Sequence, residues 1–140
     1  MSNVLVTGGA GFIGSHLVDA LLARGDHVRV FDNFSTGNRA NLDTNHPRLE
    51  IVEGDLTDPQ AVTQAVEGIE VVFHQAALSS VPRSVERPLD THAACVTGTL
   101  YLLDAARRAG VRRLVYAASS SAYGDQPTSS KRETDLPAPI

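Results

Sequence analysis

Tryptophan is absent from this sequence of 140 residues, which has only one cysteine, Cys95, and one methionine. A single cysteine excludes an intramolecular disulfide and fits a reducing compartment, so the expected location is the cytoplasm. No apolar run reaches the length of a membrane span, and the first predicted strand begins too early to leave room for a signal peptide. The net charge of −4 comes without a basic stripe, which argues against nucleic acid as a partner.

What the sequence does contain is a regular alternation of short apolar runs and amphipathic segments. This alternation predicts a single α/β domain, in which helices cover a parallel sheet. The expected strands are Asn3–Val6, His27–Phe31, Leu49–Val52, Val71–His74 and Leu114–Ala118. The expected helices are Gly11–Ala23, a weak one near Asn38–Leu42, one from Thr57 to Gly68 and a long one over Leu89–Ala109. Between them, Gln75–Pro88 is expected to be a long loop, and Asp125–Ile140 a polar, proline-bearing loop or tail.

The stretch Val4–Gly14 combines a strand, a glycine-dense turn and the start of a helix. In such a turn Gly8 permits the tight bend, Gly11 lets a pyrophosphate approach the backbone, and Gly14 lets helix and strand pack closely. The N–H groups of the turn and the helix dipole point at the same place, which makes an anion site. Simple chain reversal is the alternative use of these glycines. The apolar face expected for this helix is Phe12, Ile13, Leu17, Ala20 and Leu21.

Small or polar residues follow the predicted strands, at the edge where open α/β sheets bind ligands. Asp32 lies about 20 residues beyond the glycine turn, where a carboxylate accepts a hydrogen bond from a ribose 2′-hydroxyl. Because a carboxylate repels a 2′-phosphate, NAD is favoured over NADP. Asp55 either meets the adenine amino group or serves a turn. Ala76 and Ala77 let the chain pass close to a dinucleotide.

Several candidates keep two interpretations at this stage. Arg83 either pairs with a substrate phosphate through its planar fork or lies on the surface. A serine of Ser119–Ser121 either hydrogen-bonds a sugar hydroxyl or carbonyl undergoing redox, or caps a turn. His74 is interpreted as a strand-end packing or hydrogen-bonding residue rather than a catalyst. The other histidines lack metal-ligand spacing, so no metal site is predicted.

As a set, these residues resemble the extended short-chain dehydrogenase/reductase family, and within it the NAD-dependent nucleotide-sugar epimerases. Thr7–Gly14 matches the cofactor turn of that family, and Asp32–Gly37 is similar to its ribose-binding loop. Ser79–Ser84 and Ser119–Asp125 resemble the branch that interconverts UDP-hexoses or UDP-N-acetylhexosamines at C4. The resemblance covers the whole chain and implies a Rossmann-like, doubly wound parallel sheet of about five strands.

The resemblance also implies roles for individual residues. The residues implied to hold NAD are Gly8, Gly11, Phe12, Ile13, Gly14, Asp32, Asn33, Ser35, Thr36, Gly37, Asp55, Leu56, Gln75, Ala76 and Ala77. Those implied to act on a UDP-sugar are Ser119, as the catalytic serine, and Ser79, Arg83, Ser120 and Ser121, as substrate-binding residues. The implied reaction is reversible hydride transfer: NAD takes hydride from C4, the 4-keto sugar turns over, and the hydride returns to the other face.

The chain departs from the family pattern at two places. The family's base is a Tyr-x-x-x-Lys pair, which the resemblance places a few residues beyond Ile140. Cys95 stands where the family usually has an Asn that ties the helix to the active-site backbone. We therefore expect a truncated protein, in which residues 1–124 form the NAD-binding domain, the C-terminal substrate domain is absent and epimerase activity is little or none.

Two rival functions stay open. A nucleotide-sugar 4,6-dehydratase usually carries Thr-Asp-Glu after the fifth strand, so Ser119–Ser121 argues against it. A non-enzymatic NAD-binding module would leave Ser119 without a role. We also expect association into oligomers, as in the dimers of the family, because a free fifth strand and one apolar stripe of the long helix would lack cover. The helix has two such stripes, one of Val96, Leu100 and Leu103 and the other of Cys95, Thr99, Leu102 and Ala106.

Overall fold

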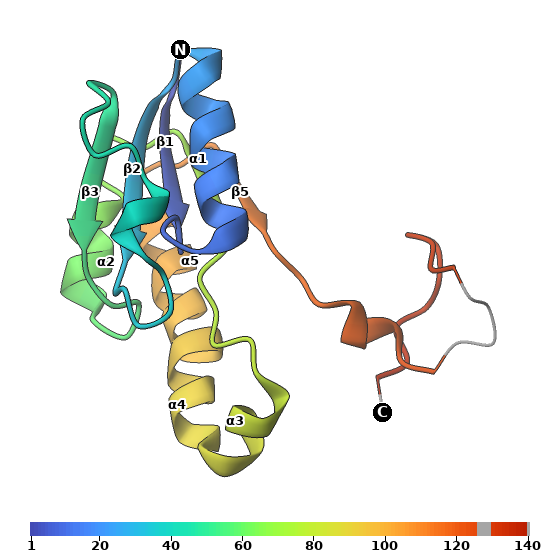
Figure 1. Ribbon diagram of the computed structural model, residues 1–140. Coiled ribbons are helices and arrows are strands. Elements are labelled where there is room, and N and C mark those ends of the chain that lie inside the picture. The colour runs from blue at the N-terminus through green and yellow to red at the C-terminus, as the bar shows by residue number, and fades with distance from the viewer. Residues whose placement is uncertain (126–129, 140) are drawn as a thin grey trace.

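A computed structural model describes residues 1–125 and 130–139, and in these ranges five parallel strands form one sheet (Figure 1). The strands are β1 (Asn3–Thr7), β2 (His27–Asp32), β3 (Leu49–Glu53), β4 (Val71–His74) and β5 (Arg113–Tyr116). Their order is β3-β2-β1-β4-β5. The chain therefore winds outward from β1 to β3 and then crosses to the other side of β1, which confirms the Rossmann-like, doubly wound sheet.

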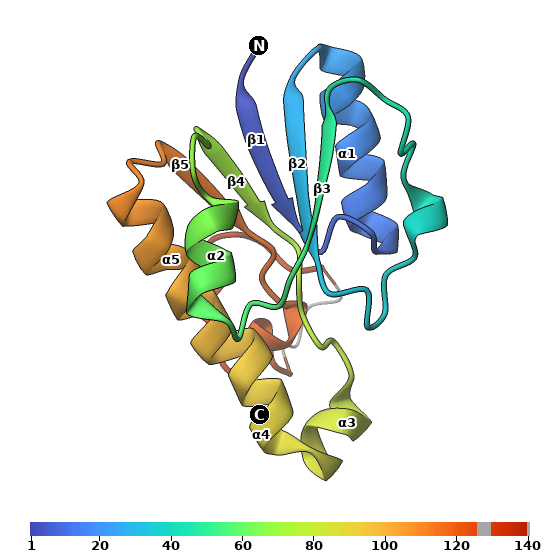
Figure 2. The same cartoon turned by 90° about the vertical axis from the view of Figure 1, so that its left-hand side faces the viewer.

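Helices cover both faces of the sheet, α1 on one and α2 and α5 on the other (Figures 1 and 2). The helical elements are α1 (Phe12–Arg24), η1 (Arg39–Asn41), α2 (Pro59–Ala65), α3 (Val81–Glu86), α4 (Pro88–His92), η2 (Ala93–Thr97), α5 (Gly98–Arg108) and η3 (Ser120–Tyr123). Successive side chains of β1 point to opposite faces: Leu5 joins the core under α2 and α5, while Val4 and Val6 join the core under α1. Residues Val4–Val6 of this central strand are thus all apolar because both of its faces are buried.

Local signals explain where two helices begin and end. Asp58 caps α2, since its side chain accepts from the backbone N–H groups of Gln60 and Ala61, and Pro59 occupies the first turn. Gly25 ends α1 in the left-handed conformation with φ of 96°. Both features confirm the sequence interpretation.

The predicted apolar face of α1 is only partly confirmed: Leu21 is buried and Leu17 packs partly buried against the core, but the other three residues are exposed. Phe12 and Ile13 are 78% and 68% exposed, and Ala20 is exposed. The buried residues are Gly14, Ser15, Val18, Leu21 and Leu22. A Cβ on Gly14 would overlap the carbonyl oxygen of Gly8 and lie 2.8 Å from Gly9 Cα. Because only the glycine side of the helix can approach β1 so closely, this contact sets the rotation of α1 and overrides the apolar periodicity.

The stretch predicted as a loop over Gln75–Pro88 also differs, because it contains the six-residue helix α3. The side chain of Ser80 accepts from Arg83 N at the start of α3, and Pro82 lies in its first turn. The predicted long helix exists, but it is divided into α4, a π-helical turn η2 and α5. Figure 1 shows α3 and α4 projecting beyond the carboxyl ends of the strands.

After β5 the chain leaves the sheet and runs to η3 (Figure 1). The fifth strand ends at Tyr116 rather than at the predicted Ala118. The described residues 130–139 contain neither helix nor strand, as predicted for this segment, and Ala138 N donates to Ala122 O at 3.0 Å. The predicted tail also includes residues 126–129 and 140, which lie outside the described residues.

Candidate functional site

A cavity of about 980 Å³ opens at the carboxyl ends of the strands, beside β1 and β4, the two neighbouring strands whose following connections run to opposite sides of the sheet. This is the switch point at which open α/β sheets bind ligands. Every residue that the sequence predicted to hold NAD lines this cavity. So do Ser79 and Arg83, two of the predicted substrate-binding residues.

The glycine turn forms the floor of this cavity. Gly8 has a φ of 68°, the left-handed region that a glycine adopts without strain. Gly11 begins α1 without any side-chain cap, and the first turn of the helix contains no acidic residue. A Cβ on Gly11 would meet only Gly8 O, at 3.3 Å, so its other side is open. The free N–H groups and positive end of the dipole therefore face space that an anion can fill.

Asp32 links this turn to the loop that follows β2. Its side chain is 7% exposed, and its two carboxylate oxygens accept from Ala10 N at 2.9 Å and Phe34 N at 2.8 Å. Each oxygen retains lone-pair capacity for a further donor such as a ribose hydroxyl. A Cβ on Gly37 would lie 2.9 Å from Ala10 Cβ, so the loop presses against the turn. This packing places one carboxylate at the cavity edge.

Asp55 performs the turn role and also lines the cavity. Its Oδ1 accepts from Thr57 N at 2.8 Å, and its Oδ2 accepts from Asn33 Nδ2 at 2.6 Å. Burial by itself would raise the pKa of Asp55, but the hydrogen bonds from Thr57 and Asn33 outweigh it and hold that pKa below its usual value. Asp55 is thus a fixed carboxylate acceptor on the side of the cavity formed by β3.

The wall formed after β4 lies directly against the glycine turn. A Cβ on Gly8 would be 2.7 Å from both N and Cα of Ala76. Gln75 N donates to Thr7 O at 3.1 Å, which continues the pairing of β1 with β4. Cys95 Sγ accepts from Leu78 N at 3.4 Å. The Cys95 thiol in η2 therefore links this helical turn to the cavity wall. In the family that the sequence resembles, an Asn usually stands at this position.

Sequence reasoning missed several residues that line the same cavity: Phe31, Gly54, Thr57, Leu78, Arg87, Asp90, Ala93 and Ala94. Arg87 Nη2 pairs with Asp90 Oδ2 at 2.6 Å at the start of α4. Arg83 and Arg87 are four residues apart, a spacing that places two side chains on the same face of a helix. This spacing is the sequence signal that could have added Arg87 to the predicted site. Both arginines reach the cavity because α3 and α4 project past the sheet.

The serines predicted after the fifth strand lie elsewhere in the described part of the chain. Ser119–Ser121 are exposed and are not among the described residues that line the cavity. Ser119 caps η3, and its Oγ accepts from Ser121 N at 3.2 Å. The structure thus displays the turn-capping role, and the catalytic and sugar-binding roles of these serines stay predictions.

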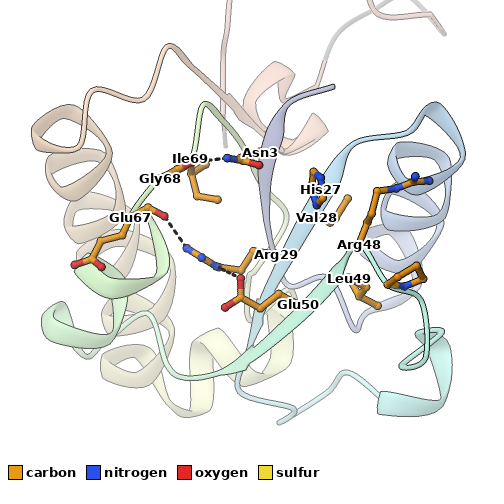
Figure 3. A pocket seen from close by; sticks show the side chains of 11 residues that line it. Asn3, His27, Val28, Arg29, Arg48, Leu49, Glu50, Glu67, Gly68 and Ile69 are labelled. Carbon is orange, nitrogen blue, oxygen red and sulfur yellow. Dashed lines mark hydrogen bonds and ion pairs between the residues drawn. The ribbon is translucent and has the colours of Figure 1, made fainter.

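A second, smaller cavity of about 350 Å³ lies at the opposite end of the strands (Figure 3). Arg29 in it donates to Glu50 Oε2 at 2.7 Å and to Glu67 O at 2.9 Å. Arg48 donates instead to Leu22 O at 3.2 Å. Because the Arg29 charge is paired and Arg48 is turned toward α1, this cavity is not a candidate site.

The described residues contain no group of three or more His, Cys, Asp or Glu side chains arranged to hold a metal ion. None of their helices has the length and apolar character needed to cross a membrane.

A sequence model of the NAD dependent epimerase/dehydratase family matches residues 4–140. The chain belongs to this family. It is 40% identical over 134 residues to a UDP-glucose 4-epimerase from Klebsiella pneumoniae, covering 89% of this chain and 94% of that one. The NAD complex of UDP-glucose 4-epimerase from Thermus thermophilus superposes with a TM-score of 0.89 and 43% identity, over 98% of this chain and 44% of that one.

The match extends to the dehydratases of the family. The dTDP-glucose 4,6-dehydratase from Streptomyces venezuelae, solved with NAD bound, has a TM-score of 0.90 and 39% identity. That alignment covers 98% of this chain and 45% of the dehydratase. The chain thus spans less than half the length of these two solved relatives.

Proposed function

We propose that this chain binds NAD in the cavity and is the NAD-binding portion of a nucleotide-sugar 4-epimerase. One observation carries the proposal: the uncapped N-terminus of α1 and the buried carboxylate of Asp32 face the same cavity at the switch point of the sheet. These are the two groups that a dinucleotide needs, one for its pyrophosphate and one for its adenosine ribose. NAD dependence in the family and NAD in two solved relatives support the assignment.

The residues present fit NAD. The N–H groups at the start of α1 would bind the pyrophosphate, with Gly11 leaving the space for it. Asp32 would accept from the ribose and disfavour a 2′-phosphate by charge repulsion. Asp55 and Asn33 would flank the adenine, and Gln75–Ala77 would form the opposite wall. When bound, NAD supplies a reversible acceptor for hydride.

The substrate side of the proposal is a UDP-hexose or UDP-N-acetylhexosamine, changed at C4. Ser79 and Arg83 line the outer part of the cavity, where Arg83 would pair with a substrate phosphate. Ser119 would hydrogen-bond the C4 oxygen, and Ser120 and Ser121 would line the sugar pocket. Removing the proton from the C4 hydroxyl needs a base, and we assign that role to no residue of this chain. We therefore propose that the 140 residues bind the cofactor with little or no epimerase activity of their own.

The extent of the binding unit and its setting are part of the same proposal. Residues 1–124 would form the NAD-binding domain, in the cytoplasm, where the free thiol of Cys95 stays reduced. Self-association is supported by the exposure of Val96, Leu100 and Leu103, which are 56%, 63% and 46% exposed along one stripe of η2 and α5. Val115 and Tyr116 on β5 are also exposed, at 40% and 55%.

The proposal is tested by mass analysis of ligand released from the purified chain, followed by assay of C4 epimerisation of UDP-galactose and UDP-N-acetylgalactosamine. We expect NAD to be found or to bind on addition, and no turnover without a second polypeptide. Turnover by the chain alone would contradict the assignment of inactivity. Elimination of water from dTDP-glucose would instead favour the dehydratase, which the similarity to the Streptomyces venezuelae enzyme makes the second candidate.

A further inference from the structure

A buried histidine lies beside the cavity and has no part in the proposed function. His74 ends β4 and is 1% exposed. It immediately precedes Gln75–Ala77, the segment that forms one wall of the cavity. Its ring is enclosed by β1, β5 and α5, through Thr7, Tyr116 and Thr99.

Both ring nitrogens of His74 have hydroxyl partners. Nδ1 lies 2.6 Å from Thr7 Oγ1, and Nε2 lies 2.9 Å from Thr99 Oγ1. Thr99 Oγ1 also donates to Cys95 O at 2.7 Å. Since that bond uses the only hydroxyl proton of Thr99, its oxygen must accept from Nε2–H.

The other side of the ring follows from the first. A neutral imidazole carries one N–H, so Nδ1 accepts from the hydroxyl of Thr7. Thr7 Oγ1 in turn accepts from Ala76 N at 3.3 Å. In the opposite tautomer, Nδ1–H, the Thr7 hydroxyl would lose its nitrogen acceptor inside a buried site. The Thr99 hydroxyl would have to donate to Nε2 and would no longer donate to Cys95 O. This tautomer therefore loses hydrogen bonds on both sides of the ring.

The result is a hydrogen-bond chain with one direction, from Ala76 N–H through Thr7, His74 and Thr99 to Cys95 O. It joins β1, β4 and the π-helical turn η2 around the backbone of Ala76. At the same place Gly8 is so close to Ala76 that a Cβ would lie 2.7 Å from its N and Cα. The chain thus holds the cavity wall at the closest approach between that wall and the glycine turn.

We propose that His74 is a positioning residue, whose Nε2–H tautomer fixes this one-way chain and thereby holds Ala76 against the glycine turn in the geometry that receives NAD. The functional part of this inference rests on the proposed NAD binding, whereas the tautomer and the order of the wall do not.

Threonine variants test the proposal without changing the ring itself. Thr7→Val removes both the donor to Nδ1 and the acceptor for Ala76 N–H, and Thr7→Ser keeps them. Thr63→Val is the matched control, because the Thr63 hydroxyl only donates to Pro59 O on the surface of α2. We expect Thr7→Val to speed hydrogen exchange of the Ala76 amide roughly tenfold and to weaken NAD binding by a similar factor. Thr7→Ser should restore both values, and Thr63→Val should change neither.

Nitrogen NMR of the histidine-labelled chain reads the tautomer directly, without cofactor. The proposal expects protonated Nε2 and unprotonated Nδ1 in the parent, and loss of that fixed tautomer in Thr99→Val. A proton on Nδ1, or an Ala76 amide that exchanges at the parent rate in Thr7→Val, overturns the proposal. A parent chain that shows the tautomer but binds no NAD refutes the proposed function instead, so the two failures are distinguishable.

Discussion

Acid should destabilise this chain through His74, in a pH range that no carboxylate of lowered pKa controls. Burial lowers the pKa of His74 from 6.5 to about 4. Between these values the unfolded chain binds a proton that the folded chain does not, so the free energy of unfolding rises with pH. The stabilising contribution of His74 is fully present above pH 6.5. Hydrogen bonds hold the pKa values of Asp26 and, against its burial, Asp55 below 3.8. Their contribution is therefore lost only at lower pH.

The size of the effect follows from the two pKa values. A change from 6.5 to about 4 corresponds to about 3 kcal/mol of unfolding free energy, lost as the pH falls across that range. Urea unfolding followed by circular dichroism at several pH values between 4 and 7 measures it. With an m-value of about 2 kcal/mol/M, the midpoint should fall by roughly 1.5 M.

Two histidine variants decide whether His74 is the cause. His74→Gln should be less stable at pH 7 but should lose most of the slope between pH 4 and 6.5. His27→Gln, at an exposed position at the start of β2, should keep the slope of the parent. If His74→Gln retains the full slope, another group is responsible and the reasoning from burial is refuted.

Three further substitutions test separate parts of the structure. Gly14→Ala should destabilise the chain by about 1–3 kcal/mol and weaken NAD binding, because its Cβ would overlap Gly8 O. Ala20→Ser, on the exposed side of α1, should change neither stability nor binding. Unchanged NAD binding in Gly14→Ala would contradict the packing argument. Leu100→Glu should shift sedimentation toward monomer, since Leu100 is 63% exposed within the proposed contact stripe; a parent that already sediments as a clean monomer would refute self-association. Cys95→Val should lower the free energy of unfolding in urea by roughly 1–3 kcal/mol, because it removes the acceptor of Leu78 N. Cys95→Asn should lower it less. Equal stability of the two variants would show that the thiol contact contributes nothing.

The sequence predicted what depends on local chemistry and on topology. Asp58 and Pro59 predict the start of a helix from local chemistry alone, and α2 begins at Pro59 with Asp58 as its cap. The cofactor residues come from four separate stretches, yet they could be grouped because carboxyl ends of parallel strands meet at one edge.

The features that could not be predicted from the sequence depend on tertiary contacts. The phase of α1 is set by the contact of Gly14 with Gly8, which periodicity does not report. Helix α3 escaped detection because it spans six residues and buries none of them, so it has no apolar face to recognise. Asp90 enters the cavity only because α4 projects past the sheet, which no local pattern reveals. For Arg87 the sequence offers only its spacing of four residues from Arg83.

Calorimetric titration of the purified chain with NAD and NADP tests whether the glycine turn and Asp32 form an NAD site. We expect binding of NAD and at least tenfold weaker binding of NADP, with the preference reduced in Asp32→Asn, which keeps the shape of the side chain but removes its charge. A folded chain, shown by circular dichroism to be intact, that binds neither dinucleotide or binds NADP as tightly as NAD would contradict this expectation.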